Sequence, residues 1–403
     1  MTTTKNNEYK KLNFSNEQEQ SQACLNSAEH EKNQGRKVLN VPNLRFPEFE
    51  GEWEKMRLDA FTERVMRKNK SNQSRLPLTI SAQYGLVDQI TFFNKVVAST
   101  DLSNYYLLKK GEFAYNKSYS SDYPWGAIKR LDNYDQGALS SLYICFAPQD
   151  NVVSDFILQY FESPKWHKGI SEIAVEGARN HGLLNVAVQD FFHTYHYIPK
   201  DKKEQIKISK LLMLLDERIA TQNKVINRLQ SLIKGIANKS FHVARETKPL
   251  LEFAPNITSG NDKNGSGTIP LYGSTGIIGM VKNASQKGNI VLVARVGTIG
   301  TVQFVNEPCG VSDNALIIKA GDMTKYIYYF LKTYNFARIT SGTTQPLITA
   351  SSLKKIAVPI FDIERSSNIV RCLSGLEKKL NIEKRYLLDM VMIKQYLLRQ
   401  MFI

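Results

Sequence analysis

A segment of 41 residues that occurs twice is the feature of this chain that most constrains its fold. Residues 201–241 have a diverged second copy at residues 362–402, which begins 161 residues later. Each copy follows an aliphatic residue and a proline, at Ile198-Pro199 and at Val358-Pro359, a step that ends a strand and precedes a helix. A helix of about 40 residues is roughly 60 Å long. We therefore expect two long helices of similar length.

Apolar residues recur in each copy with the seven-residue period of a coiled coil. The period is interrupted at Gln222 in the first copy and at the equivalent Glu383 in the second, where Lys394 makes a further break. Two helices with matching apolar rows are expected to pack against each other. The rows comprise Ile208, Leu215, Leu229, Ile236, Leu212, Ile219, Ile226 and Ile233, and then Ile369, Leu376, Met390, Leu397, Leu373, Leu380 and Leu387.

The two polar interruptions at Gln222 and Glu383 favour an antiparallel pair. Each residue lies near the midpoint of its helix, and in an antiparallel pair the midpoints meet. A polar contact in an apolar seam costs stability but fixes the register. In the alternative interpretation, both side chains simply reach solvent at a loosely packed point. Antiparallel packing predicts that the two residues lie within about 10 Å, one helix diameter.

The duplication also predicts the domain organisation, because 403 residues exceed one ordinary core. Residues 1–40 are rich in Asn, Gln, Glu and Lys and are expected to form a disordered or weakly ordered tail. A globular domain at 41–200, a spacer helix at 201–245, a second globular domain at 246–358 and a second spacer helix at 359–403 follow. The expected fold is α+β, with two globular domains separated by two long antiparallel coiled-coil helices and an internal pseudo-twofold symmetry.

The globular regions contain strand-like runs and short helices, and they resemble each other faintly. Residues 289–295 and 301–304 are predicted to pair as a hairpin, and residues 153–161 and 323–334 to be helical. The tetrapeptide beginning at Lys110 corresponds to the one beginning at Lys287. This correspondence indicates that domain and helix were duplicated together.

Composition points to a nucleic-acid partner. The formal net charge is +15, which suits nucleic acid or an anionic membrane surface. No apolar run approaches the roughly 20 residues that cross a bilayer, and the first residues lack the apolar core of a secretory signal, so we expect a cytoplasmic protein that does not bind membranes. Two similar domains related by an approximate dyad would match the symmetry of duplex DNA.

These features resemble the specificity subunit of type I restriction-modification enzymes. The resemblance extends from about residue 41 to the C-terminus, and the duplication is more specific than any single motif. Besides the helix openings with Leu215-Asp216 and Leu376-Glu377, the residues that carry it are Asn43-Leu44-Arg45-Phe46-Pro47, Gly51-Glu52-Trp53, Gly126-Ala127-Ile128-Lys129-Arg130 and the run from Gly288 to Gly300.

The resemblance implies a function and a set of partners. In that family the globules are target recognition domains, each of which reads one half of a bipartite DNA word with an unspecified gap. The spacer helices set the gap and help to recruit two modification subunits, which methylate adenine with S-adenosylmethionine. Restriction subunits add translocation and cleavage driven by ATP with Mg²⁺. This chain is accordingly expected to bind double-stranded DNA, to hold no cofactor of its own and to be a non-catalytic subunit.

Two segments of the first domain are candidate DNA readers. The run 115–125 is dense in aromatic and hydrogen-bonding side chains and is expected to be a loop or strand edge; Asn and Lys can contact bases and Tyr can reach phosphates. In the run 176–182, Arg and Asn have the geometry that matches guanine and adenine. The alternative for the first run is an ordinary folded loop with Trp125 buried. The candidates are Tyr115, Asn116, Lys117, Tyr119, Ser120, Trp125, Arg179, Asn180 and His181, with Lys129 and its neighbour Arg130 as phosphate contacts or, alternatively, as a solvated basic turn.

The second domain offers three polar turns, at residues 272–276, 295–298 and 340–346. Glycine lets the backbone approach a phosphate, and hydroxyl and amide side chains can contact phosphates or bases. The alternative is that the glycines serve only tight chain reversal. The candidates here are Tyr272, Ser274, Thr275, Arg295, Thr298, Thr343, Thr344 and Gln345.

Motifs for catalysis are not recognisable in the sequence. It contains no GxxxxGK[ST] phosphate-binding loop and no Asn-Pro-Pro-Tyr run of the kind adenine methyltransferases use. His193 and His196 have no cysteine ligands nearby, so no metal site is expected. The competing hypotheses are a free-standing DNA-binding regulator or architectural protein, which would bind its site alone, and an unrecognised nuclease or methyltransferase, which would turn over without partners.

Overall fold

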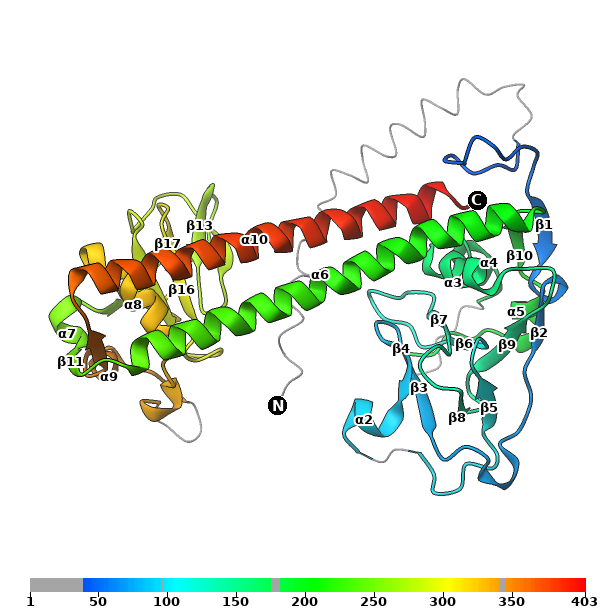
Figure 1. The fold of residues 1–403 in the computed structure, drawn as a ribbon, viewed down its shortest axis with the longest axis horizontal. Coiled ribbons are helices and arrows are strands. Elements are labelled where there is room, and N and C mark those ends of the chain that lie inside the picture. Colours follow the sequence, from blue (N-terminus) through cyan, green and yellow to red (C-terminus); the bar gives the residue numbers. More distant parts are fainter. Residues whose placement is uncertain (1–38, 96–97, 175–181, 341–345) are drawn as a thin grey trace. The chain divides into compact units, whose positions relative to one another are not determined.

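The computed structural model describes residues 39–95, 98–174, 182–340 and 346–403. The chain divides into two compact units, and many of their elements are labelled in Figure 1. The first unit comprises residues 1–213 and 394–403, and the second comprises residues 214–393. Apart from Leu39 and Asn40, the predicted tail lies outside the described residues. Both long helices contribute to both units.

The first unit contains two four-stranded sheets, a strand pair and short helices. The bounds of its elements are β1 (Glu54–Arg57), β2 (Thr62–Arg64), β3 (Pro77–Ser81), β4 (Gly85–Asp88), α2 (Gln89–Phe93), β5 (Tyr106–Lys109), β6 (Phe113–Asn116), β7 (Ala127–Arg130), β8 (Gln136–Leu139), β9 (Ile144–Pro148), α3 (Ser154–Glu162), α4 (His167–Ile173), α5 (Val188–Phe192) and β10 (Tyr195–Ile198). One sheet has the strand order β2-β9-β6-β7 and the other β4-β3-β8-β5, while β1 pairs with β10.

The second unit contains a four-stranded sheet, a three-stranded sheet and a strand pair. The bounds of its elements are β11 (Glu246–Pro249), α7 (Leu250–Phe253), β12 (Thr258–Ser259), β13 (Ile269–Tyr272), β14 (Ile277–Val281), β15 (Ile290–Ala294), β16 (Val302–Val305), β17 (Gly310–Val311), β18 (Ala315–Ile318), α8 (Thr324–Leu331), α9 (Ala350–Lys354) and β19 (Ala357–Ile360). The sheets have the orders β12-β18-β15-β16 and β14-β13-β17, while β11 pairs with β19.

The two units repeat one topology, which agrees with a duplication. The sheet β2-β9-β6-β7 corresponds strand by strand to β12-β18-β15-β16, and β4-β3-β8 corresponds to β14-β13-β17. In both units the middle strand of the latter set is antiparallel to one neighbour and parallel to the other. The predicted pairing of β15 with β16 is confirmed, and α3 and α8 lie where short helices are expected. The loops that join equivalent strands therefore correspond to each other.

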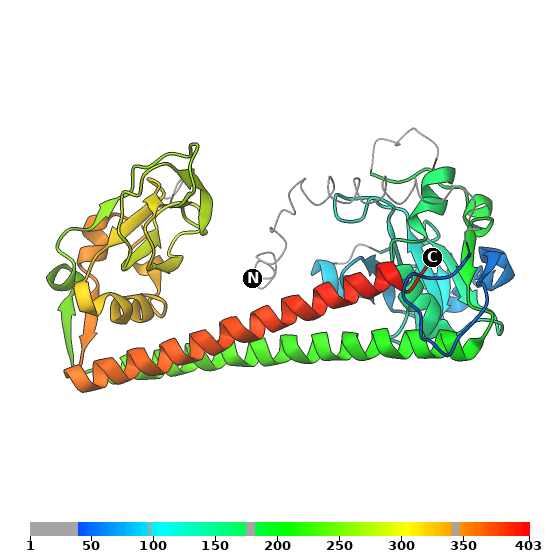
Figure 2. The same ribbon diagram turned by 90° about the horizontal axis from the view of Figure 1, so that it is seen from above.

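The long helices α6 (Lys202–His242) and α10 (Ile363–Gln400) form the predicted antiparallel pair. Within the second unit, Nε2 of Gln222 lies 2.6 Å from Oε2 and 3.1 Å from the backbone oxygen of Glu383. The amide donates to both oxygens, so the two polar interruptions meet, as the antiparallel interpretation requires. Figure 2 shows the two helices side by side with opposite chain directions. The alternative, in which each side chain reaches solvent separately, is wrong.

Heptad residues of both helices supply core side chains in each unit. In the second unit, Ile226 and Ile233 of α6 belong to the same buried cluster as Leu373 and Leu380 of α10. In the first unit, residues from the other ends of the two helices share a core. That set comprises Ile208 and Leu212 of α6, Leu398 of α10, and Met401 and Phe402, which directly follow α10. Burying one such side chain contributes roughly 1.5–3 kcal/mol, so the apolar rows hold each helix firmly to its partner.

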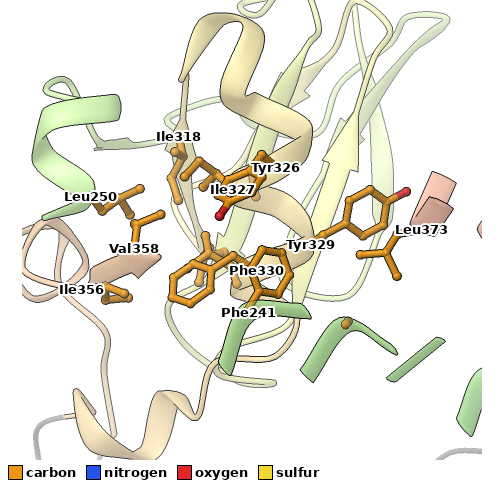
Figure 3. Close-up of a cluster of buried hydrophobic side chains, with 14 of the residues drawn as sticks. Phe241, Leu250, Ile318, Tyr326, Ile327, Tyr329, Phe330, Ile356, Val358 and Leu373 are labelled. Atoms are coloured by element: carbon orange, nitrogen blue, oxygen red, sulfur yellow. The ribbon is translucent and has the colours of Figure 1, made fainter. Parts of the chain in front are cut away.

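The core of the second unit joins the end of α6 to the sheet and to α8 (Figure 3). The ring of Phe241 packs edge-on against Tyr326 and Phe330, at centroid distances of 5.3 and 5.6 Å. The hydroxyl of Tyr326 donates to the backbone oxygen of Pro359 in β19, so this buried polar group is satisfied. Figure 3 also shows Tyr329 pointing toward α10. Both long helices therefore position α8.

A buried ion pair holds the start of α6 in the first unit. The guanidinium nitrogens Nε and Nη2 of Arg45 each donate to the carboxylate of Glu204 at 2.8 Å, and the indole of Trp53 donates to the same carboxylate at 3.1 Å. The Glu204 side chain is only 2% exposed. The hydrogen bond with Glu204 raises the pKa of Arg45 above its ordinary value. Residues that carry the family resemblance thus form a structural anchor.

The same N-terminal segment also contacts the end of α10. The backbone N–H of Leu44 donates to the carbonyl oxygen of Gln400 at 2.9 Å, and the Asn43 side chain donates to the Gln400 side chain at 3.0 Å. The last carbonyls of a helix have no partner within the helix, so this contact satisfies one of them. Trp53 packs edge-on against Phe402, with the ring centroids 6.5 Å apart. Residues 43–53 thus join the first turn of α6 to the last turn of α10.

A neutral histidine is buried in the first unit. The ring nitrogens of His196 are each 2.8 Å from a hydroxyl, Nδ1 from Tyr160 and Nε2 from Thr194. The Thr194 hydroxyl donates to the carbonyl of Phe191, so it accepts from Nε2, and Tyr160 donates to Nδ1. Burial lowers the pKa of His196 to about 3. The ring is therefore held in its neutral form.

This histidine makes the stability of the first unit depend on pH. Between an unfolded pKa of about 6.5 and a folded pKa of about 3, only the unfolded chain binds the proton, so stability falls as pH falls. We expect a loss of about 2 kcal/mol between pH 7.5 and pH 5. Urea unfolding followed by tryptophan fluorescence measures it, because all three tryptophans (Trp53, Trp125 and Trp166) lie in the first unit.

Two variants make the pH prediction specific to this ring. His196→Asn is expected to be less stable at pH 7.5 and to lose this part of the pH dependence, because it has no titrating group. His193→Gln, at an exposed position nearby, is expected to behave as the unaltered chain does. An equally steep pH dependence in His196→Asn would contradict the assignment.

Candidate DNA interface

In the second unit, two of the predicted polar turns lie side by side. The Thr298 hydroxyl donates to the backbone oxygen of Ser274 at 3.3 Å, and the Gln303 side chain donates to the carbonyl of Gly273 at 2.9 Å. The turn between β13 and β14 is therefore bonded to the turn between β15 and β16. Thr298 and its neighbour Thr275 are exposed to solvent, while Ser274 is partly exposed.

A residue just downstream of the third predicted turn contacts the same cluster. The backbone N–H of Ile348 donates to the carbonyl of Arg295 at 3.1 Å. Arg295 itself is partly exposed and begins the turn that follows β15. Ile348 thus lies beside the turn that begins at Arg295, and the two turns form one polar surface.

The equivalent cluster in the first unit follows β6. The N–H of Leu184 donates to the carbonyl of Lys117 at 2.9 Å, and the N–H of Tyr119 donates to the carbonyl of Gly182 at 3.0 Å. Residues 117–119 are thus tied to residues 182–184, as the Arg295 segment is tied to Ile348.

This correspondence places Lys117 and Arg295 at equivalent positions. Each is the first residue after the equivalent strands β6 and β15, and the backbone carbonyl of each accepts from a downstream segment. An Arg or a Lys can donate to guanine or to phosphate. Both residues are candidates from the sequence, but the sequence alone does not show that they are equivalent, because their surroundings share no motif. Their equivalence follows from the strand order.

Six of the predicted site residues lie outside the described residues. They belong to the segments 175–181 and 341–345, which adjoin the two clusters in sequence, so their contribution stays a prediction. They are Arg179, Asn180, His181, Thr343, Thr344 and Gln345.

The prediction that Tyr115 contacts DNA is corrected by its burial. Tyr115 is the third residue of β6 and has no exposed surface, and its ring stacks on Phe191 at a centroid distance of 5.0 Å. Its hydroxyl donates to the carbonyl of Trp125 at 2.9 Å, so the core satisfies the polar atom. Burial raises the pKa of this tyrosine well above its ordinary value. Trp125 itself is half-buried against the same core.

The next two candidates of this loop are partly exposed and support its turn. The side-chain oxygen of Asn116 accepts from the N–H of Ser118 at 3.0 Å. Nζ of Lys117 lies 3.4 Å from the carbonyl of Val186, which is a weak contact. The lysine can therefore turn to a ligand at little cost, whereas Asn116 also holds the loop.

Tyr119 and Ser120 are available at the surface, where both are exposed. Ser120 and Tyr123 exchange two backbone hydrogen bonds, each of 3.1 Å, which close the turn. The loop therefore combines a rigid turn with side chains that can reach a ligand.

The two predicted phosphate contacts are already paired with carboxylates. Lys129 lies 2.5 Å from Glu162, and Arg130 lies 2.7 Å from both Asp132 and Asp155. The side chains of Lys129 and Arg130 are only 14% and 11% exposed, so a phosphate would have to displace these carboxylates to reach either cation.

Tyr272 is engaged in a similar way. Its hydroxyl donates to the carboxylate of Glu307 at 2.8 Å. Partial burial and the neighbouring carboxylate raise the pKa of this tyrosine above its ordinary value. The hydroxyl therefore stays protonated and would have to leave Glu307 to reach a phosphate.

The topology adds a loop that does not stand out in the sequence. The turn between β3 and β4 corresponds to the turn between β13 and β14, and β4 contacts β7 as Gln303 of β16 contacts Gly273. Its exposed residues are Gln83 and Tyr84. In the sequence, this turn is indicated only by a short run of alternating apolar and polar residues followed by Gly85. That signal is weak unless the first unit is compared with the second.

A second surface of the second unit lies between α8 and α10. It is a hollow of about 460 Å³, and its lining combines cationic and apolar side chains. The carboxylate in its lining, Glu377, accepts from Lys332 and Tyr328 at 2.7 Å and from Tyr329 at 2.9 Å. Although burial alone raises it, the pKa of Glu377 is held below its ordinary value by Lys332 and the two hydroxyls. Other lining residues are Phe304, Lys325, Lys378, Ile382 and Arg385.

Helix α10 carries an exposed apolar row that begins at this hollow. Ile382, Tyr386 and Ile393 are all more than half exposed. Their spacing of four and seven residues places them on one side of the helix. An apolar row of this length on a helix surface is typical of a partner-binding face.

Among the described residues, no three or more His, Cys, Asp or Glu side chains are grouped so that they could hold a metal ion. In the same part of the chain, every helix is too short or too polar to cross a membrane.

Comparison with known proteins identifies the second half of the chain. Residues 246–389 match the model of the type I restriction modification DNA specificity domain. This segment belongs to that family. A type I restriction enzyme specificity subunit of Haemophilus influenzae is 26% identical to the chain over 143 residues. The match covers 32% of this chain and 37% of that protein, so the chain spans little more than a third of the length of this relative.

Solved structures extend the likeness to the whole fold. The S subunit of a type I restriction-modification system from M. genitalium superposes with a TM-score of 0.59 at 17% identity, over 90% of this chain and 99% of that chain. A chain from a type I R-M system studied for complex assembly and conformational transition has a TM-score of 0.53 at 14% identity, over 86% and 96% of the two chains. The resemblance inferred from the sequence is therefore confirmed, and both units have the fold of a type I specificity subunit.

Proposed function

We propose that this chain is the DNA specificity subunit of a type I restriction-modification complex. Each globular domain would read one half of a bipartite target, with the loop clusters at Lys117 and Arg295 as the reading surfaces. The observation that carries the proposal is the recurrence of one loop cluster, with a cation at the same place, in two units of the same topology. Because the loop sequences differ, the two half-sites need not be related.

In this proposal, side chains of loops that are held by the sheets would recognise the DNA through hydrogen bonds. Lys117 and Arg295 would donate to bases or phosphates, while Tyr119, Thr275 and Thr298 would add contacts from the neighbouring turns. The net charge of +15 favours association with DNA of any sequence. Specificity would then depend on the loops, and general affinity on the basic surface.

The chain is proposed to act with partners and without catalysis of its own. Two modification subunits would supply S-adenosylmethionine-dependent adenine methylation, and restriction subunits would supply ATP- and Mg²⁺-dependent translocation and cleavage, in the cytoplasm with the DNA. The apolar row of α10, from Ile382 to Ile393, supports a protein partner, because such a row on a helix is typical of a partner-binding face. An adenine must leave the base stack before it can be methylated, so the specificity subunit would hold the duplex beside the methyltransferase.

Domain exchange tests the proposed reading. Replacing residues 51–200 with the equivalent region of a relative of different specificity is expected to change one half of the methylated word. The other half and the gap should stay as they were, because residues 246–358 are unaltered. Genome-wide mapping of methylated adenines, in cells with and without the chain, reads out both halves at once.

The reciprocal exchange of residues 246–358 is the matched control and is expected to change only the other half. A single exchange that alters both halves, or methylation that is the same without the chain, would contradict the proposal. Methylation or cleavage by the isolated chain would contradict its non-catalytic role.

A further inference from the structure

The edge strand β14 of the second unit presents large apolar side chains to solvent. It is the outer strand of the sheet β14-β13-β17. Ile277, Ile278 and Met280 are 57%, 47% and 41% exposed. An exposed apolar edge strand invites aggregation, and proteins usually protect such edges with charge or cover them. Residues 264 and 265 bond the backbone of Met280 and so cover this edge in part, but the apolar side chains stay exposed and need an explanation.

The first unit has the same feature at the equivalent place. Strand β4 is the outer strand of the corresponding sheet, with Tyr84 just before it and Phe92 and Phe93 in the helix α2 that follows it. All three rings are about half exposed. Tyr84 packs edge-on against Phe92 at 6.4 Å, and Phe92 against Phe93 at 5.0 Å. The residue types differ between the units, yet both expose an apolar cluster beside the same strand.

These apolar clusters adjoin the candidate reading loops. A Cβ added to Gly273 would lie 2.8 Å from Cδ1 of Ile278, so this side chain rests on the turn that receives the hydrogen bonds of Gln303 and Thr298. In the first unit, β4 contacts β7, the strand that follows the Lys117 loop. Each cluster thus continues the surface on which the proposed DNA contacts lie.

The charges around the clusters match a polyanion. Lys282 follows β14, and Lys263 precedes Asn264, whose side chain accepts from the N–H of Met280 at 3.0 Å. Within the described residues, neither lysine forms an ion pair. The nearby Asp262 is occupied, because it accepts from the Ser285 hydroxyl and from the N–H of Val311. In the first unit, the exposed Lys95 follows the aromatic cluster in the same way.

We infer that the apolar clusters beside β4 and β14 are DNA-contacting surfaces that engage the apolar parts of bases. The inference rests on the proposed function and adds residues to its reading surface. Thymine methyl groups and partly opened base steps are the two parts of duplex DNA that isoleucine, methionine and phenylalanine contact. The flanking lysines would hold the phosphates on either side of such a contact.

Salt dependence separates this contact from electrostatic binding. The test uses the complex of the full chain with its modification subunits and measures duplex affinity over a range of salt concentrations. Ile278→Ser with Met280→Ser is expected to weaken binding at least about tenfold at every salt concentration, because two apolar side chains no longer leave water on binding. The slope of log K against log salt should not change, because no phosphate contact is lost.

Three controls complete the test. Leu251→Ser, at a similarly exposed apolar position on α7, is expected to leave affinity unchanged. Lys282→Ala is expected to reduce the salt slope. Replacing thymine by uracil in the target removes the methyl group and so separates the two base contacts. If the unaltered complex loses affinity and the double variant does not, the apolar cluster contacts the methyl group. If both lose affinity equally, the cluster contacts the opened base step.

Several outcomes would overturn the inference. The first is an unchanged DNA affinity of the double variant. The second is failure of this variant to assemble with the modification subunits, because the cluster would then be a protein-docking surface. If instead the unaltered complex does not distinguish its target from a scrambled duplex, the proposed function itself fails. The two failures are therefore distinguishable.

Discussion

Removing one heptad from both long helices is expected to shorten the unspecified gap of the proposed target by roughly three base pairs. Seven helical residues span about 10 Å, and a base pair about 3.4 Å. Residues 215–221 of α6 and 384–390 of α10 are the segments to delete. They lie opposite each other in an antiparallel pair in which Gln222 contacts Glu383. The polar contact and the apolar rows on either side are then retained.

The two half-sites should remain as they were, because both domains are unaltered. Mapping of methylated adenines measures the gap and the half-sites together. Deleting residues 215–221 alone is the control, and it is expected to abolish methylation because the paired ends of the two helices would then be displaced by about 10 Å relative to each other. A double deletion that methylates the original target would refute the role of the helices as spacers.

Arg45→Ala is expected to destabilise the first unit by about 3 kcal/mol or more. The substitution leaves the carboxylate of Glu204 buried with only the indole of Trp53 as its donor among the described side chains. Removing one partner of a buried ion pair costs about 3–5 kcal/mol, because the other charge stays uncompensated. Urea unfolding followed by tryptophan fluorescence reports on the first unit, which contains Trp53 itself.

Two further variants show whether the buried charge causes the loss. Arg57→Ala breaks the exposed pair with Asp59 and is expected to cost less than about 1 kcal/mol. Adding Glu204→Gln to Arg45→Ala should recover part of the stability, because the uncompensated charge is gone. If the double variant is no more stable than Arg45→Ala alone, lost packing is the cause.

The sequence is most informative where the structure is periodic. The heptad rows and the placement of Gln222 and Glu383 suffice to predict two long antiparallel helices, because the packing of such helices follows from the spacing of their apolar residues. The hairpin of β15 and β16 is equally readable, from two apolar runs around a glycine turn. Each helix and the hairpin can be recognised from the spacing within its own copy, and the antiparallel pairing follows from the matched polar interruptions in the two copies.

Tyr115 illustrates where the sequence misleads. The polar run that follows it suggests a surface loop, but the first three residues of β6 are buried and the tyrosine still belongs to the core. Its hydroxyl donates to the carbonyl of Trp125, so the polar atom of this side chain does not show that the residue is exposed. Only the strand pairing decides on which side of the sheet a residue lies.

Contacts between distant segments that share no repeated pattern cannot be predicted from this sequence. The pairing of Arg45 with Glu204 spans 159 residues, and that of Asn43 with Gln400 spans 357. The equivalence of Lys117 with Arg295 likewise depends on the strand order, which cannot be read from any sequence motif. The candidate readers are therefore predictable as loops but not as a paired arrangement in two units.

The contact between Gln222 and Glu383 also links the histories of the two copies. One partner comes from each repeat, so a change inherited by one repeat leaves its counterpart without a match in the seam. We therefore expect substitutions at these two positions to be correlated, although 161 residues separate them. The proposed reading loops belong to separate units, so each could diversify while its counterpart stays as it is.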